Sequence, residues 1–426
     1  MEFDMPADAK TNLSDVATDP QLLSAMVGLS ESRSMAGLAD PDQLGIVVLP
    51  FTNLSGESSQ QYLSDGITED IIIRLARFKE LKVAARTAAF RFQGDDINSG
   101  DAARLLGARY VVKGTALKNG NRLIISCQLL EALTGNLLWG ERYDRQTADI
   151  FLVQDEVIGR IVTALGGRVV AAGVTSIRRK PTEIWSAYDF FLRGRDLCSA
   201  GNESAAEPFF VKAIELDPDF ALAHAWHAIA LIGMFWANAD QGKLNQAFQS
   251  ASAALALDPN EAAAHHTAGM ALNYLRKFDR SAFHFGRAIE LNPLDVNIRG
   301  DYANLLLHIG RNADAISMIE EVLKRDPYPP AWLHYAHGKF LFFAKRFKDA
   351  ISVLENGNVY HYRTHGFLAA SHQILGHIED ARREVGLMKE SNVNVSFAQF
   401  SATLAFADLT ALDFFFEALR NAGFDG

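Results

Sequence analysis

The spacing of apolar residues predicts short strands and helices in the first part of the chain. Residues 46–51 form a continuous apolar run, which is typical of a buried strand. In residues 123–130, a set with polar members (Ile124, Ser126, Gln128) alternates with an apolar set (Ile125, Cys127, Leu129). This alternation predicts another strand. Residues 67–78 repeat apolar side chains at spacings of four, four and three, which predicts a helix with one apolar face. Further segments complete the predicted order of strand, helix, strand, helix, three strands and helix: 81–84, 100–106, 110–117, 137–143 and 149–165.

The residues around position 64 predict where the first of these helices begins. Ser64 is suited to cap it, because a short hydroxyl side chain can accept a hydrogen bond from a free backbone N–H group. Asp65, Glu69 and Asp70 then fall near the helix start, where negative charge complements the helix dipole. We therefore interpret this acidic cluster as structural and not as a metal-binding or catalytic set.

A different and longer period organises the second half of the chain. Pro259, Pro293 and Pro327 are 34 residues apart, and Pro218 stands 41 residues before the first of them. An Asp or Asn precedes each of these prolines. Proline cannot continue a helix, and a short polar residue before it favours a turn. Each dipeptide therefore marks the end of one predicted helix pair and the start of the next.

Small side chains recur at fixed places in the same frame, and they let two antiparallel helices approach closely. The second repeat carries a seven-residue insertion around residues 234–241. Position 8 of successive repeats is Gly194, Ala228, Gly269, Ala303 and Gly338. Position 20 is Ala206, Ala247, Ser281, Ala315 and Ala350. This pattern resembles the tetratricopeptide repeat, or TPR. The resemblance covers residues 187–390, with a weaker sixth copy from Tyr362, and implies a solenoid of about six helix pairs.

Residues 46–170 resemble a second family. The segments VVLPFTNLSG, YLSDGITEDI and DIFLVQDEV are similar to the TolB-like N-terminal domain, which is also grouped with FlgO-like domains. In bacteria this domain often precedes TPR repeats. In longer relatives the pair follows a class III adenylate cyclase domain or a winged-helix DNA-binding domain. The resemblance implies a mixed-sheet α/β domain, and we expect neither upstream activity in residues 1–45.

The predicted fold class is thus α/β plus all-α, a mixed-sheet domain followed by a helical-hairpin solenoid. Residues 1–45 carry eight acidic and two basic residues, and we expect a disordered acidic leader, with a docking peptide or an export signal as alternatives. Residues 171–186 are expected to be a linker. Residues 391–426 are expected to form capping helices, because the last repeat would otherwise expose an apolar face.

Composition narrows the classes of function. The chain has 426 residues, of which 49% are hydrophobic and 22% charged, as in ordinary globular proteins. The net charge of −10 argues against non-specific binding to nucleic acid or to an anionic membrane. Cys127 and Cys198 fall in different predicted domains and provide neither a disulfide framework nor a metal site. Because the N-terminus lacks a secretory signal pattern, we expect a cytoplasmic protein.

The sequence contains no recognisable catalytic or cofactor motif. No phosphate-binding glycine loop is present, and no stretch offers the paired metal-binding aspartates that a class III cyclase needs. His361 and His365 have the spacing of helical metal ligands, but they fall in a poorly matched junction. We interpret the histidines as packed or exposed residues. The prediction is a non-enzymatic protein without metal or cofactor.

The remaining candidate site is the concave face of the solenoid. In TPR arrays the first helix of each pair lines this face, so positions 2, 5, 9, 12 and 13 are the expected contacts. Asn304 and Lys339 share position 9 and faintly resemble the clamp that some TPR proteins use for chain ends, although the other clamp positions do not match. The alternative for any single residue is packing inside the chain or under the neighbouring domain. The candidates are Tyr188, His266, Asn273, Tyr274, Asn304, His308, Trp332, Tyr335, Lys339 and Phe342.

These observations support one leading hypothesis and three others. The leading hypothesis is a regulatory or scaffold protein that binds a protein or peptide in its TPR groove, without binding nucleic acid or membrane. The alternatives are the regulatory portion of an adenylate cyclase-type signalling protein, a transcription-regulator-like protein without its DNA-binding domain, and an α/β domain that binds a small ligand. The sequence leaves homo-oligomer formation open.

Overall fold

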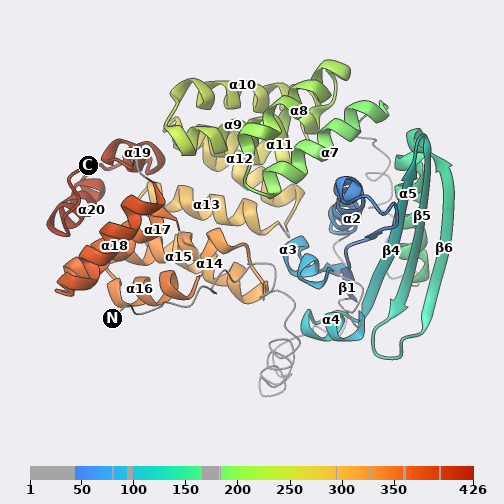
Figure 1. Cartoon of the computed structure of the whole chain (residues 1–426), viewed down its shortest axis with the longest axis horizontal. Coiled ribbons are helices and arrows are strands. Elements are labelled where there is room, and N and C mark those ends of the chain that lie inside the picture. Colours follow the sequence, from blue (N-terminus) through green and yellow to red (C-terminus); the bar gives the residue numbers. More distant parts are fainter. Residues whose placement is uncertain are drawn as a thin grey trace, which may run out of the picture.

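The chain folds into a mixed-sheet α/β domain followed by a solenoid of paired helices, as Figure 1 shows. The predicted fold class is therefore confirmed. No described helix combines the length and the hydropathy that a bilayer-spanning segment needs. Residues 1–43 of the predicted leader lie outside the described residues, whereas its last two residues, Leu44 and Gly45, already belong to a strand. Most of the predicted linker, with its basic run at 178–180, also lies outside the described residues. The computed structural model describes residues 44–78, 81–93, 99–165, 182, 184–293, 295–326, 328–357, 361–392 and 395–426.

The sheet of the α/β domain is parallel on one side and antiparallel on the other. Its strand order is β3-β1-β4-β5-β6, with the short strand β2 also paired to β4. Strand β1 runs parallel to β3 and β4, whereas β4, β5 and β6 form an antiparallel meander. The strands are β1 Leu44–Val48, β2 Thr52–Asn53, β3 Leu81–Val83, β4 Tyr110–Asn119, β5 Arg122–Glu131 and β6 Leu137–Gln146.

Helices cover both faces of the first strand, which explains its continuous apolar run. Ile46 and Val48 are buried in the same core as residues of α2 and α5. Val47 and Leu49 are buried in a second core with residues of α3, η2 and α4. A strand covered on both sides must be apolar at consecutive positions. The helices of this domain are α2 Gln61–Leu75, α3 Arg86–Ala89, α4 Ser99–Leu105 and α5 Ile150–Ala164, with the 3-10 turns η1 Ser58–Gln60, η2 Phe90–Phe92 and η3 Thr147–Asp149.

The predicted start of α2 is wrong. The helix begins at Gln61, because the turn η1 leads directly into it, and Ser64 lies inside the helix with 1% of its surface exposed. Asp65, Glu69 and Asp70 therefore lie beyond the first turn, where the helix dipole has little effect. The ion pairs described below explain Glu69 and Asp70 instead.

The solenoid consists of antiparallel helix pairs that end where the prolines predict. Asp217, Asp258, Asn292 and Asp326 are the residues that follow the second helices α8, α10, α12 and α14. Each of them donates its backbone N–H to a carbonyl four residues earlier. The helices are α7 Trp185–Ser199, α8 Glu203–Leu216, α9 Ala221–Asn238, α10 Gln241–Leu257, α11 Ala262–Tyr274, α12 Phe278–Leu291, α13 Val296–His308, α14 Asn312–Arg325, α15 Ala331–Phe343, α16 Phe347–Asn356, α17 Tyr362–Ile374 and α18 Ile378–Ser391.

The small residues at repeat position 8 face a large apolar residue of the same pair. A Cβ atom added at Gly338 would lie 2.4 Å from Leu354 Cγ. The same construction at Gly194 reaches Phe210 at 2.8 Å. In these pairs, one small and one large residue thus set the distance between the two helices.

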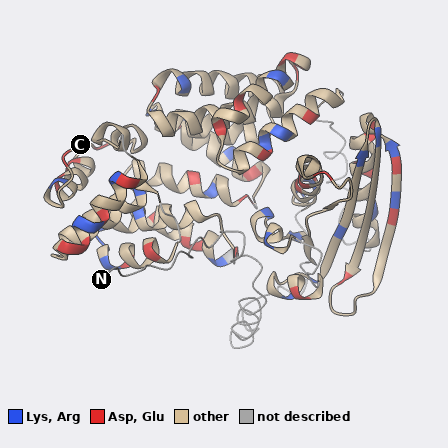
Figure 2. Ribbon diagram, viewed as in Figure 1, with Lys and Arg blue, Asp and Glu red and all other residues tan. Residues whose placement is uncertain are grey.

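The chain ends in two helices that fold back onto the last repeats. Helices α19 Phe397–Thr403 and α20 Thr410–Asn421 contribute Phe400 and Phe415 to an aromatic cluster with α15 and α17. In this cluster the ring centroids of Phe367 and Phe415 are 4.5 Å apart. Figure 2 shows basic and acidic residues interspersed over the helices and along β6.

We predict opposite effects for two glycine-to-alanine changes in helices. Gly338→Ala should destabilise the protein by about 1–2 kcal/mol, because overpacking against Leu354 outweighs the better helix propensity of alanine. Gly386→Ala is the matched control, because nothing lies within 4 Å of the added methyl group. The control should gain up to about 1 kcal/mol. Urea unfolding measures both, and equal signs would contradict this account of position 8.

Candidate functional site

A cavity of about 1840 Å³ lies between the α/β domain and the first helices of the repeats. Its lining comes from α2, β3 and α3 on the domain side, and mainly from α7, α9, α11, α13, α15, α17 and α19 on the solenoid side, with end residues of α8 and α12. Helices α2 and α3 lie between the sheet and the helix pairs in Figure 1. The cavity therefore occupies the concave face that the repeat pattern predicts as the contact surface.

The α/β domain touches the solenoid at two separate places. Helix α2 packs on α7, where a Cβ atom added to Gly66 would lie 2.6 Å from Leu192. A second contact reaches the loop after α14, where Thr87 Oγ1 donates to Asp326 Oδ2 at 3.0 Å. The rings of Phe92 and Tyr328 meet edge to face in the same region, with centroids 6.1 Å apart. The domain thus spans from the first pair to the end of the fourth, and the cavity lies between these contacts.

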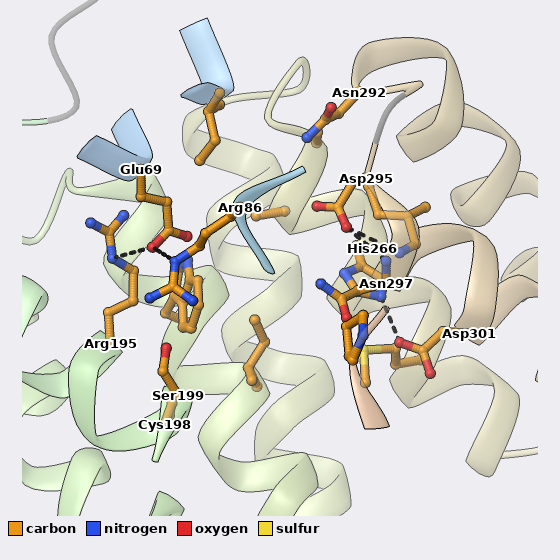
Figure 3. A pocket seen from close by; sticks show the side chains of 18 of the residues that line it. Glu69, Arg86, Arg195, Cys198, Ser199, His266, Asn292, Asp295, Asn297 and Asp301 are labelled. Atoms are coloured by element: carbon orange, nitrogen blue, oxygen red, sulfur yellow. Dashed lines mark hydrogen bonds and ion pairs between the residues drawn. The ribbon is translucent and has the colours of Figure 1, made fainter. Parts of the chain in front are cut away.

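One wall of the cavity is an ion-pair network at the first contact. Arg195 is 3% exposed, and it pairs with Glu69 at 3.5 Å and with Asp70 at 3.1 Å. Burial alone would lower the pKa of Arg195, but the two carboxylates outweigh it and raise that pKa. Glu69 also pairs with Arg86 at 2.9 Å, so it lies between two arginines in Figure 3. Glu69 and Asp70 of α2 therefore fasten the domain to α7.

The wall formed by α11 and α13 is polar but internally satisfied. His266 Nε2 lies 2.9 Å from Asp301 Oδ2, as the dashed line in Figure 3 shows. Trp332 Nε1 donates to Asn297 Oδ1 at 3.2 Å. These contacts each join residues 35 apart in sequence, so they connect one repeat to the next.

Two cations lie at the α15–α17 end of the cavity. Lys339 is 5% exposed, and its Nζ donates to Asn304 Oδ1 at 2.6 Å. Burial, and then the nearby charge of Arg363, lower the pKa of Lys339 to about 7, although Asp301 acts in the opposite direction. The ammonium group therefore titrates in the physiological range, unlike that of an exposed lysine.

The structure places the predicted groove residues in two groups. Six line the cavity: His266, Tyr274, Asn304, Trp332, Tyr335 and Lys339. Asn273, His308 and Phe342 do not line it, because they are packed inside the solenoid with at most 2% of their surface exposed. Tyr188 is also fully buried, at the contact between α7 and the α/β domain. These four predicted groove residues are therefore packed inside the protein and do not form part of the cavity surface.

Each of the internal residues has an identifiable partner. His308 Nδ1 lies 3.0 Å from Asn273 Oδ1, and its ring meets Phe406 of the returning C-terminal segment. Phe342 belongs to the aromatic cluster beneath the capping helices. Tyr188 donates its hydroxyl to Asp70. The repeat frame alone could not identify Asp70, Phe406 or Phe415 as partners, because they come from outside the repeats.

The predicted groove omits several residues that line the cavity. Arg363 stands at position 2 of the sixth repeat, so applying the rule to that weak copy would have found it. Asp301 stands at position 6, outside the rule. Arg86, Glu69 and Arg195 come from the domain contact, for which the repeat pattern has no signal.

The described part of the chain holds one group of three side chains whose atoms are close enough to hold a metal ion. His361 and His365 do not pair, because His361 caps α17 and His365 Nδ1 bonds to Glu384 at 2.7 Å. Ligand atoms of His372, His377 and Asp380 instead lie within 4.8 Å of one another. Asp380 is already paired with Arg383 at 2.7 Å.

Both thiols are poor nucleophiles in this fold. Burial raises the pKa of Cys127 to about 12, inside the sheet core. Cys198 lines the cavity, and burial followed by the charge of Glu203 raises its pKa to about 12 as well. A thiolate is the reactive form of cysteine, so neither side chain is activated.

Comparisons with known proteins identify one sequence relative and several structural ones. The chain matches no family model. Over 247 residues it is 36% identical to "Putative adenylate cyclase 3" of Rhizobium meliloti (strain 1021), which covers 57% of this chain and 42% of that protein. The chain therefore spans less than half of that relative's length.

Solved structures of repeat proteins share low sequence identity with the chain. A tetratricopeptide repeat protein from Parabacteroides merdae has 12% identity and a TM-score of 0.41, and covers 61% of this chain and 98% of its own. PilF of Pseudomonas aeruginosa has 17% identity and a TM-score of 0.37, and covers 50% of this chain and 95% of its own. The fold assignment rests on the helix pairs of this chain itself.

We predict that Arg195→Met destabilises the folded protein by about 3 kcal/mol, because it leaves two carboxylates in a buried contact without their shared cation. Lys212→Met is the matched control. Lys212 forms an exposed pair with Glu215, so its loss should cost less than about 1 kcal/mol. Denaturant unfolding measures both, and equal losses would contradict a fastening role for Arg195.

We also predict that Lys339→Met stabilises the ligand-free protein, and that this gain depends on pH. The folded protein releases the Lys339 proton near pH 7, whereas an unfolded lysine keeps it until about pH 10.4. Between these values the unfolded chain binds more protons, so the stability of the wild type rises with pH.

The advantage of Lys339→Met should therefore be complete below pH 7 and should shrink as the pH rises toward 10. Unfolding free energies at pH 6.5 and 9.5 test this, with Lys212→Met as the control that should follow the wild-type profile. Arg363 and Asp301 are the charged groups that act on Lys339. A constant difference between Lys339→Met and wild type would contradict the assignment.

Proposed function

We propose that this protein is a non-enzymatic regulatory or scaffold module that holds a peptide segment of a partner protein in its central cavity. The cavity itself carries the proposal. Most of its lining on the solenoid side comes from the first helices of successive repeats, the surface that TPR arrays present to partners. Its volume of about 1840 Å³ exceeds the range of about 300–1,000 Å³ for small-molecule sites. An extended peptide fits such a space better than a metabolite.

The aromatic residues of the lining are suited to anchor such a segment. Trp226, Trp236, Tyr274, Trp332 and Tyr335 all line the cavity. Tryptophan and tyrosine dominate the energetics of protein interfaces, because they bury large surfaces with little loss of conformational freedom. The two contacts between the domain and the solenoid support a preformed site, which lowers the entropic cost of binding.

The proposed absence of catalysis is supported by the chemistry of the cavity. The raised pKa of Cys198 keeps its thiol protonated. Glu69 and Asp70 are engaged by arginines, and Asp301 by His266. These groups hold the protein together and are not free to act on a substrate. We assign residues 46–170 to the TolB-like kind of domain on the sequence motifs. We propose a cytoplasmic location, because the free thiols of Cys127 and Cys198 fit a reducing compartment.

A second candidate function is the regulatory portion of a cyclic-nucleotide signalling protein, with catalysis supplied by another domain or chain. The specific support is the 36% identity to the Rhizobium meliloti relative. A cyclase assay of the purified protein with ATP and Mn²⁺ or Mg²⁺ tests the non-enzymatic proposal directly. Formation of cyclic AMP above the background of a buffer control would overturn it.

We predict that the double variant Trp332→Ala/Tyr335→Ala loses peptide binding at least about tenfold, because both side chains line the cavity. Peptides selected from a displayed 12-residue library against the wild type serve as probes, and fluorescence polarisation measures their affinity. Phe283→Ala is the control, because Phe283 is 66% exposed on the second helix of its pair and does not line the cavity. Unchanged affinity in the double variant would count against the cavity as the binding site.

A further inference from the structure

Lys339 and Arg363 bring two positive charges into the cavity without an ion-pair partner among the described residues. Lys339 is nearly buried, and its ammonium group is held by the amide oxygen of Asn304. An amide is neutral, so this hydrogen bond satisfies one donor but does not balance the charge. A buried charge without a counter-charge is costly.

Arg363 is satisfied only in part. Its Nη2 donates to the carbonyl oxygen of Trp236 at 2.6 Å, in the last turn of α9, and its guanidinium lies over the ring of Tyr362. Its Nε is buried and has no hydrogen-bond partner among the described residues. The hydroxyl of Thr364 is also buried without a hydrogen-bond partner among the described residues, and the residue as a whole is 2% exposed. Both residues line the cavity, so unused donors gather at the same end as the unpaired charge.

The buried cation Arg195, on another wall of the cavity, provides a comparison, because its charge is balanced within the chain. Arg195 lies between Glu69 and Asp70, and all of its charge is compensated inside the chain. At the Lys339 end, Asp301 is the counter-charge that acts on the ammonium, and it bonds to His266. When Lys339 is protonated, two positive charges and one negative charge leave one positive charge in excess. One carboxylate from outside the chain would balance it.

We propose that Lys339, Arg363 and Thr364 form an anchor for one carboxylate side chain, Asp or Glu, of the bound peptide. This inference rests on the proposed function of peptide binding. Lys339 would supply the ammonium, while Arg363 Nε and the Thr364 hydroxyl belong to residues that line the same cavity and have no hydrogen-bond partner among the described residues. Charge-assisted hydrogen bonds of this kind are stronger than neutral ones.

The depth of the site favours a side chain over the end of a chain. Trp332 and Tyr335 are partly exposed, whereas Lys339 is nearly buried, so the ammonium lies deeper than these aromatic residues. A peptide that packs its backbone along the aromatic residues reaches the ammonium with a side chain. A carboxylate at this site identifies the partner segment as acidic at one position and apolar around it.

The test uses three libraries of acetylated seven-residue peptides with the same random flanks. The first has a central Glu and an amidated end, the second a central Gln and an amidated end, and the third a central Gln and a free carboxyl end. Affinity selection on the full-length protein with mass-spectrometric readout compares them. We expect wild type to retain the Glu library at least about tenfold better than the Gln amide library. Lys339→Met and Arg363→Met should bring this ratio close to one, and Lys212→Met should leave it unchanged.

Each other result has a defined meaning. Equal retention of the Glu and Gln amide libraries by wild type would overturn the anchor and leave the peptide-binding function intact. A preference for the free-carboxyl library would overturn the side-chain assignment. A preference for Glu that survives in Lys339→Met and Arg363→Met would place the anchor elsewhere. Retention of none of the libraries would overturn the proposed function together with the anchor. Thermal stabilisation by inorganic phosphate without a preference for Glu would replace the carboxylate by a phosphate.

Discussion

The buried contact of Arg195 with Glu69 and Asp70 is the interaction on which the arrangement of the two parts depends. It joins α2 of the α/β domain to α7 of the first repeat, and Tyr188 adds its hydroxyl to the same aspartate. The apolar core is continuous across this contact, from the sheet through Phe191 to the second repeat. Because one core and one ion-pair network span the boundary, the α/β domain acts as a fixed wall of the cavity.

The repeats turn this fixed boundary into a concave surface. Each pair sets its contact distance with one small and one large residue, and successive first helices then line a shared cavity. The capping helices return over the last repeats and bury the apolar face that would otherwise be exposed. As a result, residues at equivalent repeat positions can lie in different environments. At position 13 of successive repeats, Tyr274 lines the cavity, whereas His308 is covered by Phe406.

The two buried cations Arg195 and Lys339 show a division between stability and binding. Arg195 has its counter-charges inside the chain, so it strengthens the fold. Lys339 donates to an amide oxygen and lies over the rings of Tyr335 and Phe340, but it forms no ion pair among the described residues, so its charge weakens the ligand-free fold. Proteins retain such unfavourable groups mainly where binding or catalysis requires them. The electrostatic imbalance therefore supports a site that is completed by a partner.

The sequence by itself determined the strand and helix order, the helix pairs and their ends, because these follow from local periods, proline turns and small residues such as Gly338. It also placed Trp332, Tyr335 and Lys339 on the concave helices. Only the tertiary structure decided the roles of Glu69, Asp70 and Tyr188, since their partners lie more than 100 residues away. It also decided that Arg363 joins Lys339 in the cavity, while the returning C-terminal segment covers His308. Local patterns encode which face of a helix is apolar, but contacts between distant segments depend on how the whole solenoid curves.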